Sequence, residues 1–513
     1  MRLTTLATGA LLAVLASACS KTDSSQPRQD GGNDTNSPKP DASNEAGSTV
    51  RVRPAGAAAD VSEEITGGNG PFIGAATGLT VPDGYVEHEY VASGTATAYQ
   101  ASGALSEDGL WTFEPDTTAA YRTRVLIRRP LKASDFSGTV IVEWLNVSGG
   151  LDANPEYASL VEEITRQGHI WVGVSAQLIG VSGGPVLVQV PVPDAGNLVG
   201  KGLKAIDPAR YGSLTHPGDG YSFDIFTQVA RAVLQGGAVL GGAKPRVLLA
   251  AGESQSAIAL TTYYDGVQPL TLVFDGFFVH SRASAGLPLV APGKYADLTA
   301  AIVSAKPALF RTDLDAPVID LQAESDVTGI LDSVVVRQPD SDKLRLWEVA
   351  GTSHADVHLI GSIASDIDCG LPINNGPMHV VAKAALNGLD AWVKTGVLPP
   401  IAPRLKTAVP DGGTTAVARN ADGIALGGVR TPPVDVPVDV LSGVPGPSAT
   451  LICLLLGSTK PLSDARLAQL YTTRAAYQQQ YDADADAAIK AGFVLQADRD
   501  ALLAFAQPSR ISP

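Results

Sequence analysis

One short segment of the chain has the residue types and the spacing for nucleophilic chemistry. Residues 246–266 read RVLLAAGESQSAIALTTYYDG, which predicts a buried strand, a tight turn at residues 252–256 and a helix. A serine at such a bend, here Ser254, holds its hydroxyl exposed. The backbone N–H of Gln255 would point to the same space, where the helix N-terminus favours a developing oxyanion. The segment predicts a serine hydrolase with Gln255 as one oxyanion donor.

Two other pentapeptides resemble this motif, and their context excludes them. Residues 180–184 read GVSGG, but Pro185 follows at once and is incompatible with an immediate helix. Residues 351–355 read GTSHA and end a predicted strand. Ser256 stands where the motif usually has glycine, so the turn at residues 252–256 depends on a small side chain there.

The serine needs a histidine as its general base, because a neutral hydroxyl is a poor nucleophile. The chain order expected for this architecture is serine, acid and then histidine. His354 follows the predicted strand 343–350 after a short loop, which places it at the carboxyl end of that strand. We favour His354 over His358, which lies further into the following segment.

The acid that orients the histidine should follow the preceding strand, predicted at residues 316–323. Glu324 and Asp326 both fall in the next loop. We favour Asp326 because it stands a few residues beyond the strand end, as is usual for this fold. Glu324 remains the alternative.

A second oxyanion donor is expected from the loop after the predicted strand 139–146. This loop, residues 146–150, reads NVSGG, and its glycines allow a close approach of backbone to substrate. We predict the Val147 N–H as the donor. A plain glycine turn leading to a helix is equally compatible with these residues.

Strands and helices alternate from residue 139 onward, which predicts an α/β fold with a mostly parallel sheet and helices on both faces. The other predicted strands are residues 85–103, 119–129, 169–175 and 270–280. The predicted helices are residues 155–167, 221–235 and 377–395, with two more within residues 463–506. Insertions are expected at about residues 177–220 and 283–314, and a C-terminal extension from about residue 405.

The N-terminus predicts export and lipid anchoring. Arg2 precedes an apolar, alanine-rich stretch, so residues 1–18 resemble a signal peptide, and Cys19 stands where bacterial lipoproteins carry lipid. Residues 19–50 have almost no apolar side chains and predict a disordered tether before a folded body at residues 51–513. The expected location is the bacterial cell envelope, at the outer membrane, with the membrane as partner through Cys19. The alternative is a periplasmic or secreted protein without an anchor.

The three cysteines fit this compartment. With Cys19 lipidated, Cys369 and Cys453 remain as a pair, which predicts a disulfide in an oxidising environment. The loop it closes corresponds to roughly 4 kcal/mol of stabilisation in the chain-entropy model. Two buried free thiols are the alternative.

Composition narrows the possible partners. The net charge of −15 argues against nucleic acid as a partner. Asp482, Asp484 and Asp486 resemble a calcium loop only in part, because the glycine and the glutamate of such a loop are missing. The sequence therefore implies neither a metal nor an organic cofactor.

Several segments together resemble a known family, the secreted bacterial proteins with an α/β-hydrolase domain, which are esterase-like serine hydrolases. The matching segments are VEWLNVSGGLD at 142–152, YGSLTHPGDGYSFDIF at 211–226, GESQSA at 252–257, FDGFFVHSR at 274–282, ESDV at 324–327, RLWEVAGTSHAD at 345–356 and GGVRTPPVDVPV at 427–438. The resemblance implies the α/β-hydrolase fold and a serine–acid–histidine hydrolase with Ser254 and His354 at the matching positions. The matching segment ESDV contains both Glu324 and Asp326, so the resemblance does not choose between these two acids. It does not identify a substrate either.

These observations predict a lipid-anchored carboxylic-ester hydrolase acting on a small-molecule or polymeric ester. Ser254 would attack the carbonyl carbon, His354 would transfer the proton and Asp326 would orient His354. A peptidase or amidase with the same three residues is one alternative. A surface binding protein on an inactive hydrolase scaffold is another.

Overall fold

The computed structural model describes residues 53–74, 77–78, 80–189, 198–303, 306–410, 413–448 and 450–512. The predicted signal peptide, Cys19 and the predicted tether lie outside these residues. Within the described ranges, no helix is both long and apolar enough to cross a bilayer.

Nine strands of the described chain form one sheet in the order β1-β2-β3-β5-β4-β6-β7-β8-β9. They are β1 (Asp60–Glu64), β2 (Tyr85–Ala101), β3 (Phe113–Pro130), β4 (Thr139–Trp144), β5 (Ile170–Val174), β6 (Val247–Glu253), β7 (Gly276–His280), β8 (Val318–Ala323) and β9 (Leu344–Val349). The first three strands pair antiparallel, β3 pairs antiparallel with β5, and all strands from β5 to β9 pair parallel. The predicted mostly parallel sheet is confirmed.

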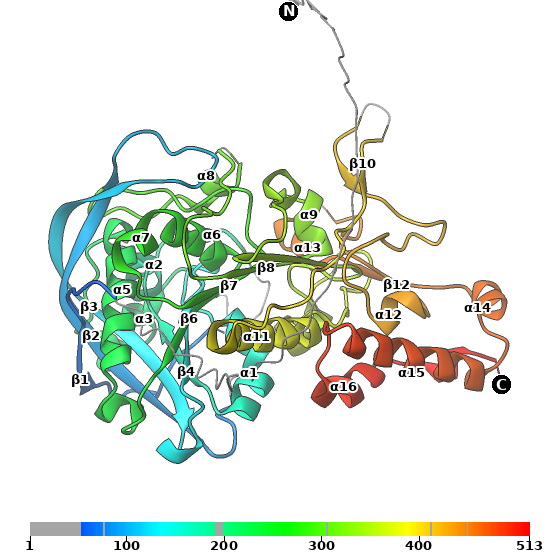
Figure 1. Ribbon diagram of the computed structural model, residues 1–513, viewed down its shortest axis with the longest axis horizontal. Coiled ribbons are helices and arrows are strands. Elements are labelled where there is room, and N and C mark those ends of the chain that lie inside the picture. Colours follow the sequence, from blue (N-terminus) through cyan, green and yellow to red (C-terminus); the bar gives the residue numbers. More distant parts are fainter. Residues whose placement is uncertain are drawn as a thin grey trace, which may run out of the picture. The chain divides into compact units, whose positions relative to one another are not determined.

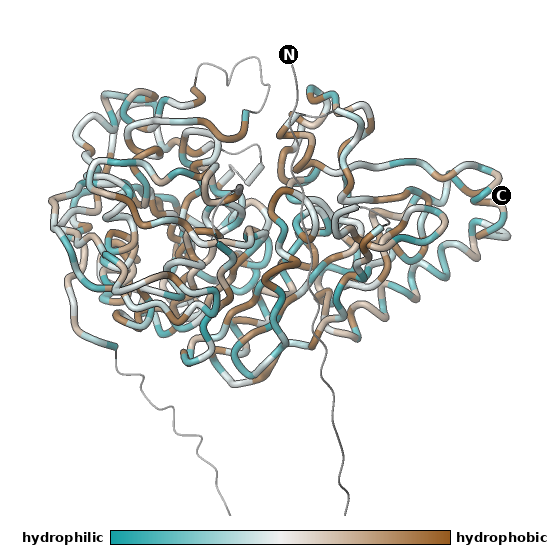
Figure 2. The backbone as a smooth tube through the Cα atoms, turned by 90° about the horizontal axis from the view of Figure 1, so that it is seen from above, coloured by the Kyte–Doolittle hydropathy of each residue, from teal (hydrophilic) through white to brown (hydrophobic). Residues whose placement is uncertain are grey.

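Helices cover both faces of the parallel strands, because alternate side chains of each buried strand point to opposite sides. On one face, α5 (Ser222–Gln235) and α6 (Gln255–Thr262) pack on Val140, Val142 and their neighbours. On the other face, α1 (Pro155–Gln167) and α11 (Met378–Thr395) pack on Ile141 and Phe278. In Figure 1, α6 lies above β7 and β8, and α11 lies below them. Figure 2 shows apolar (brown) and polar (teal) stretches alternating along the described chain, as elements with one buried face require.

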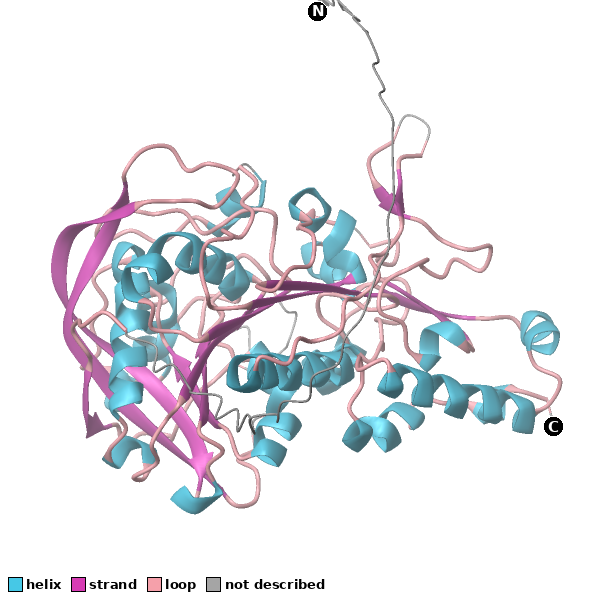
Figure 3. Ribbon diagram, in the orientation of Figure 1, coloured by secondary structure: helices cyan, strands magenta, loops and turns pink. Residues whose placement is uncertain are grey.

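The remaining elements lie in the connections and in the C-terminal part. The short helices of the connections are α2 (Leu178–Ser182), α3 (Gly202–Ile206), α4 (Pro208–Tyr211), α7 (Gln268–Thr271), α8 (Leu298–Val303), α9 (Glu324–Thr328) and α10 (Val357–Ile360). The C-terminal part contains β10 (Thr407–Ala408), β11 (Ala416–Val417), α12 (Pro432–Asp435), β12 (Asp439–Ser442), α13 (Leu451–Leu456), β13 (Ser458–Pro461), α14 (Asp464–Leu470), α15 (Arg474–Lys490) and α16 (Arg499–Leu503). Figure 3 shows these short strands and helices beside the β8–β9 edge of the main sheet.

Three sequence-based predictions of elements are wrong. The strand predicted at residues 119–129 already begins at Phe113, which pairs with Ala101 at the end of β2. The strand predicted at residues 270–280 begins only at Gly276, because the chain after α6 continues through a π-helical turn into α7. The Gln268 side chain bonds to the Phe274 backbone and fixes this longer helical end. Residues 463–506 contain three α-helices rather than two, because the chain turns at Tyr471 and again after Lys490.

Candidate active site

The turn between β6 and α6 holds Ser254 in a conformation that side chains rarely adopt. Its φ is 62° and its ψ is −120°, on the positive-φ side of the backbone map. The Ser254 N–H donates to the His280 carbonyl at 2.9 Å, which ties the turn to the end of β7. A Cβ added at Gly252 would lie 2.8 Å from the Ser256 Cβ, so the turn needs glycine at 252 and a small residue at 256. The strand, tight turn and helix predicted from the sequence are all present, and the structure adds the strain at Ser254.

Three side chains from separate parts of the chain meet at the carboxyl edge of the sheet. The Nε2 of His354 lies 2.8 Å from the Oγ of Ser254. The Nδ1 of His354 lies 2.9 Å from Oδ1 of Asp326. Ser254 follows β6, Asp326 lies in the first turn of α9 directly after β8, and His354 follows β9. Parallel strands bring their carboxyl ends to one edge, so the topology delivers these residues to one place.

Asp326 has partners on both of its oxygens. Its Oδ2 accepts hydrogen bonds from the Ser281 hydroxyl at 2.6 Å and from the Ala323 N–H at 2.8 Å. Burial alone would raise the pKa of Asp326, but His354 and these donors lower the pKa below its usual value. Burial lowers the pKa of His354, and the negative charge and hydrogen bond of Asp326 outweigh it, so that this pKa lies above its usual value. This arrangement favours an ionised carboxylate beside the His354 ring.

The two alternatives from the sequence occupy other positions. Glu324 accepts hydrogen bonds from the Gly351 N–H at 2.7 Å and the Gly443 N–H at 2.8 Å, and it forms an ion pair with Arg419. It joins the end of β8 to the C-terminal part of the fold. The His358 ring stacks on the His379 ring, with centroids 3.6 Å apart. The geometry thus favours Asp326 over Glu324 and His354 over His358.

The loop after β4 lies beside Ser254, and the N–H groups of Val147 and Ser148 in this loop are engaged within the protein. The Val147 N–H donates to Oε1 of Gln255 at 3.0 Å, and the Ser148 N–H donates to Oδ1 of Asn146 at 2.8 Å. The Asn146 amide donates to the Glu253 carbonyl at 3.1 Å, which joins this loop to β6. Val147 can therefore donate to an oxyanion only when the Gln255 side chain releases it, whereas the Gln255 N–H begins α6, where no intrahelical acceptor is available.

A cavity of about 380 Å³ opens on Ser254 and His354. Its apolar wall includes Phe72, Ile73, Leu151, Val188, Leu198, Val199, Leu359, Ile360, Ile363, Ile452 and Leu455. Among the described lining residues, Glu253 and His354 alone are ionisable. The sequence does not reveal these apolar residues, because they lie in loops and short helices where no periodicity separates a cavity wall from core packing.

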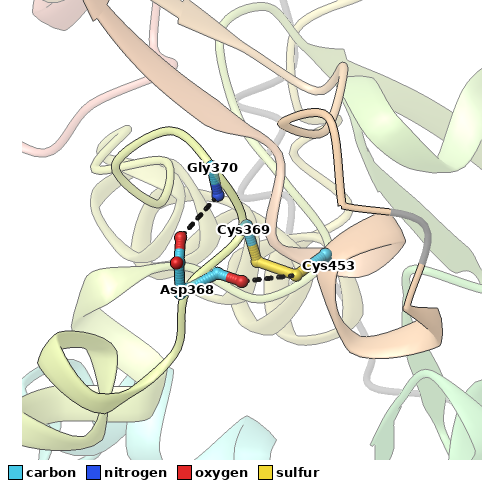
Figure 4. Close-up of a disulfide and its surroundings, with 4 residues drawn as sticks. All are labelled: Asp368, Cys369, Gly370 and Cys453. Atoms are coloured by element: carbon cyan, nitrogen blue, oxygen red, sulfur yellow. Dashed lines mark hydrogen bonds between the residues drawn. A yellow bond between two sulfur atoms is a disulfide. The ribbon is translucent and has the colours of Figure 1, made fainter.

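A disulfide joins Cys369 to Cys453 (Figure 4), as the sequence predicts. Both cysteines are buried in an apolar cluster with Ile360 and Leu456. The bridge therefore connects the segment before α11 with α13, which supplies Ile452 to the cavity. Near the bridge, the Gly370 N–H donates to the Asp368 carboxylate at 2.8 Å.

Comparisons with known proteins agree with this architecture. A family model described as an alpha/beta hydrolase domain matches residues 56–504, and the chain belongs to this family. No curated protein matches the chain. Similar solved structures include an esterase from Rhizomucor miehei, with 13% identity, coverage of 61% of this chain and 85% of that chain, and a TM-score of 0.32. A carboxyl esterase from Tuber melanosporum has 10% identity, coverage of 62% and 92%, and a TM-score of 0.28.

Proposed function

We propose that this α/β-hydrolase-domain protein hydrolyses carboxylic esters with Ser254 as nucleophile, His354 as general base and acid, and Asp326 as the group that orients His354. The observation that carries the proposal is the 2.8 Å contact between His354 Nε2 and Ser254 Oγ at the wall of the cavity. The strained backbone of Ser254 supports it, because such strain is typical of functional positions.

The reaction would proceed in two halves. Ser254 Oγ attacks the ester carbonyl carbon while its proton moves to Nε2 of His354. The imidazolium then gives this proton to the departing alcohol, which leaves an acyl group on Ser254. A water molecule releases the acid by the same steps, again with His354 as base. The Gln255 N–H, with the Val147 N–H once it is released, would stabilise the oxyanion.

The cavity favours uncharged esters with an apolar group. Its volume lies within the usual range for small-ligand sites, and its described wall is mainly aliphatic. A charged substrate group would lose its hydration there without gaining a counter-ion. Apolar acyl or alcohol chains would instead gain roughly 0.8 kcal/mol for each CH₂ that the cavity buries.

The proposal is tested with a panel of p-nitrophenyl esters from acetate to decanoate and a matched anilide. We expect burst kinetics, a preference for a medium apolar chain over acetate, and turnover of the ester well above that of the anilide. Ser254→Ala is the control and should abolish turnover. A fluorophosphonate probe should label the wild-type protein at Ser254. Absence of both turnover and labelling in folded protein would contradict a hydrolase and favour a binding role.

We further propose that the protein is anchored to a membrane of the cell envelope by lipid on Cys19. The motif and the polar segment after it are the support. In a bacterial host that processes lipoproteins, the full chain should incorporate labelled palmitate and sediment with membranes. Cys19→Ser should lose the label and move to the soluble fraction. A wild-type chain that is unlabelled and soluble would contradict the anchor.

A further inference from the structure

Three ionisable side chains that take no part in the proposed reaction meet behind Ser254. Glu156 lies in the first turn of α1, Glu253 ends β6 and His280 ends β7. Their ligand atoms all lie within 4.8 Å of one another, and each residue is at most 2% exposed. The Nδ1 of His280 is 3.3 Å from Oε2 of Glu156 and 3.8 Å from Oε2 of Glu253.

These close approaches are not hydrogen bonds. Within the described part of the chain, both oxygens of Glu156, Oε2 of Glu253 and both ring nitrogens of His280 are buried without a hydrogen-bond partner. Buried polar atoms almost always have partners, so five such atoms on three residues whose ligand atoms lie this close together point to a bound group. The neighbouring Glu143 shows the ordinary arrangement, because it accepts from two backbone N–H groups and from the Trp171 indole.

The chemistry of the group suits a cation as well. It consists of two carboxylates and an imidazole, all buried. A divalent cation would compensate the charge of two buried carboxylates.

We propose that Glu156, Glu253 and His280 bind one divalent transition-metal ion, with Zn²⁺ as the best fit. Tetrahedral zinc with ligands at about 2.1 Å has ligand-to-ligand distances of about 3.4 Å. The distances of 3.3 and 3.8 Å from His280 Nδ1 agree with such edges. They also explain why the atoms approach closely without donor and acceptor pointing at each other. An imidazole ligand argues against Ca²⁺ and Mg²⁺, which prefer oxygen.

The surroundings of the three side chains give an ion access from the cavity and a structural role beside the Ser254 turn. Glu253 lines the cavity beside Ser254, which provides access for the ion and for a water as fourth ligand. The ion would join α1, β6 and β7 and so hold the backbone on both sides of the Ser254 turn. The sequence analysis implies no metal, because these three ligands are 97 and 27 residues apart and form no spacing motif.

The experiment measures metal content and binding rather than activity, so its result does not depend on the proposed esterase reaction. The full chain is purified, stripped with dipicolinate and titrated with Zn²⁺ against a chromophoric chelator. Wild-type protein should bind one Zn²⁺ per chain and melt at a higher temperature with Zn²⁺ than without it. Co²⁺ should give visible absorption bands of a tetrahedral site, and Ca²⁺ should leave the melting temperature unchanged.

Three ligand variants locate the ion. Glu156→Gln, Glu253→Gln and His280→Asn should each weaken Zn²⁺ binding by more than the roughly 10–100-fold that loss of an outer-shell partner causes. Glu162→Gln is the matched control, because Glu162 is also on α1 but its side chain is 61% exposed. His354→Asn should retain the ion. A wild-type chain that binds no Zn²⁺ or Co²⁺, or ligand variants that bind as well as the control, would overturn the proposal and leave protons and buried water as the occupants.

Discussion

Two groups of acid and histidine flank Ser254, and they differ in one respect. In the first, Asp326 and His354, the carboxylate oxygens and both ring nitrogens have hydrogen-bond partners. In the second, Glu156, Glu253 and His280, five polar atoms lack a partner within the described residues. Both groups are buried and both lie at the carboxyl ends of parallel strands.

The difference shows that the neighbouring groups decide whether the effect of burial prevails. Burial raises the pKa of both acids, but at Asp326 the charge of His354 and the hydrogen bonds outweigh it, and the pKa is lowered. At Glu253 burial prevails, with a further contribution from Glu156, and raises the pKa to about 8. Ionised Asp326 can orient and stabilise an imidazolium, whereas Glu253 needs a proton or a cation.

The most direct test of the difference between the two groups replaces each histidine in turn with asparagine. His354→Asn should lower kcat by about four to six orders of magnitude, because the general base is lost. The loss of kcat in His280→Asn should be at least about 100-fold smaller than the loss in His354→Asn, because His280 does not touch the Ser254 hydroxyl in the proposed reaction. Steady-state ester hydrolysis measures both, with His88→Asn on β2 as a partly exposed control. Equal losses for the two variants would contradict the separate roles.

The next effect in size is that of the orienting carboxylate and its pH dependence. Asp326→Asn should lower kcat by about 10⁴-fold, because the imidazolium loses its stabilising charge and its tautomer is no longer fixed. In the wild type, kcat/KM should fall as the pH drops through the pKa of His354, which lies above its usual value of about 6.5. Removal of the charge lowers that pKa, so the acid limb of Asp326→Asn should move to lower pH. An unchanged limb would contradict the assignment.

Much of this site can be predicted from the sequence, because the relevant signals are local or topological. A buried strand, GESQS and a helix locate Ser254, and the chain order of parallel strands leads to Asp326 and His354. The choice between Asp326 and Glu324 needs the structure, since both stand at the end of β8. The partner that distinguishes Glu324 is Arg419, which lies 95 residues away in the sequence.

The sequence cannot reveal the second group in the same way. Glu156 looks like an ordinary acidic residue in the first turn of a helix, where the helix dipole favours it. Its burial depends on how α1 crosses β6 and β7, and that packing leaves no local pattern. The one signal in the sequence is the position of Glu156. This charged residue stands next to Tyr157, on the face of α1 that packs on the sheet.

Glu324 is a third buried carboxylate to compare with these two groups, because it has several hydrogen-bond partners but lies outside the proposed catalytic site. Glu324→Gln should lower the free energy of unfolding by about 2–4 kcal/mol, since an amide cannot replace the bonds to Gly351, Gly443 and Arg419. Urea unfolding measures this change. We expect kcat to stay within about threefold, because Glu324 does not contact His354. Glu63→Gln, in an exposed ion pair with Arg122, is the control and should cost under about 1 kcal/mol. A large kcat loss with little change in stability would favour Glu324 as the acid.

The smallest predicted effect concerns the support of the loop after β4. The Gln255 side chain bonds to the Val147 N–H and to Gln177, so Gln255→Ala removes the link between the nucleophile turn and this loop. The backbone N–H of residue 255 remains, and we expect kcat/KM to fall only about tenfold, which corresponds to about 1.4 kcal/mol. Gln479→Ala, at an exposed glutamine of α15, is the control. A rise in kcat would contradict a supporting role, since it would mean that the Gln255 side chain competes with the oxyanion for the Val147 N–H.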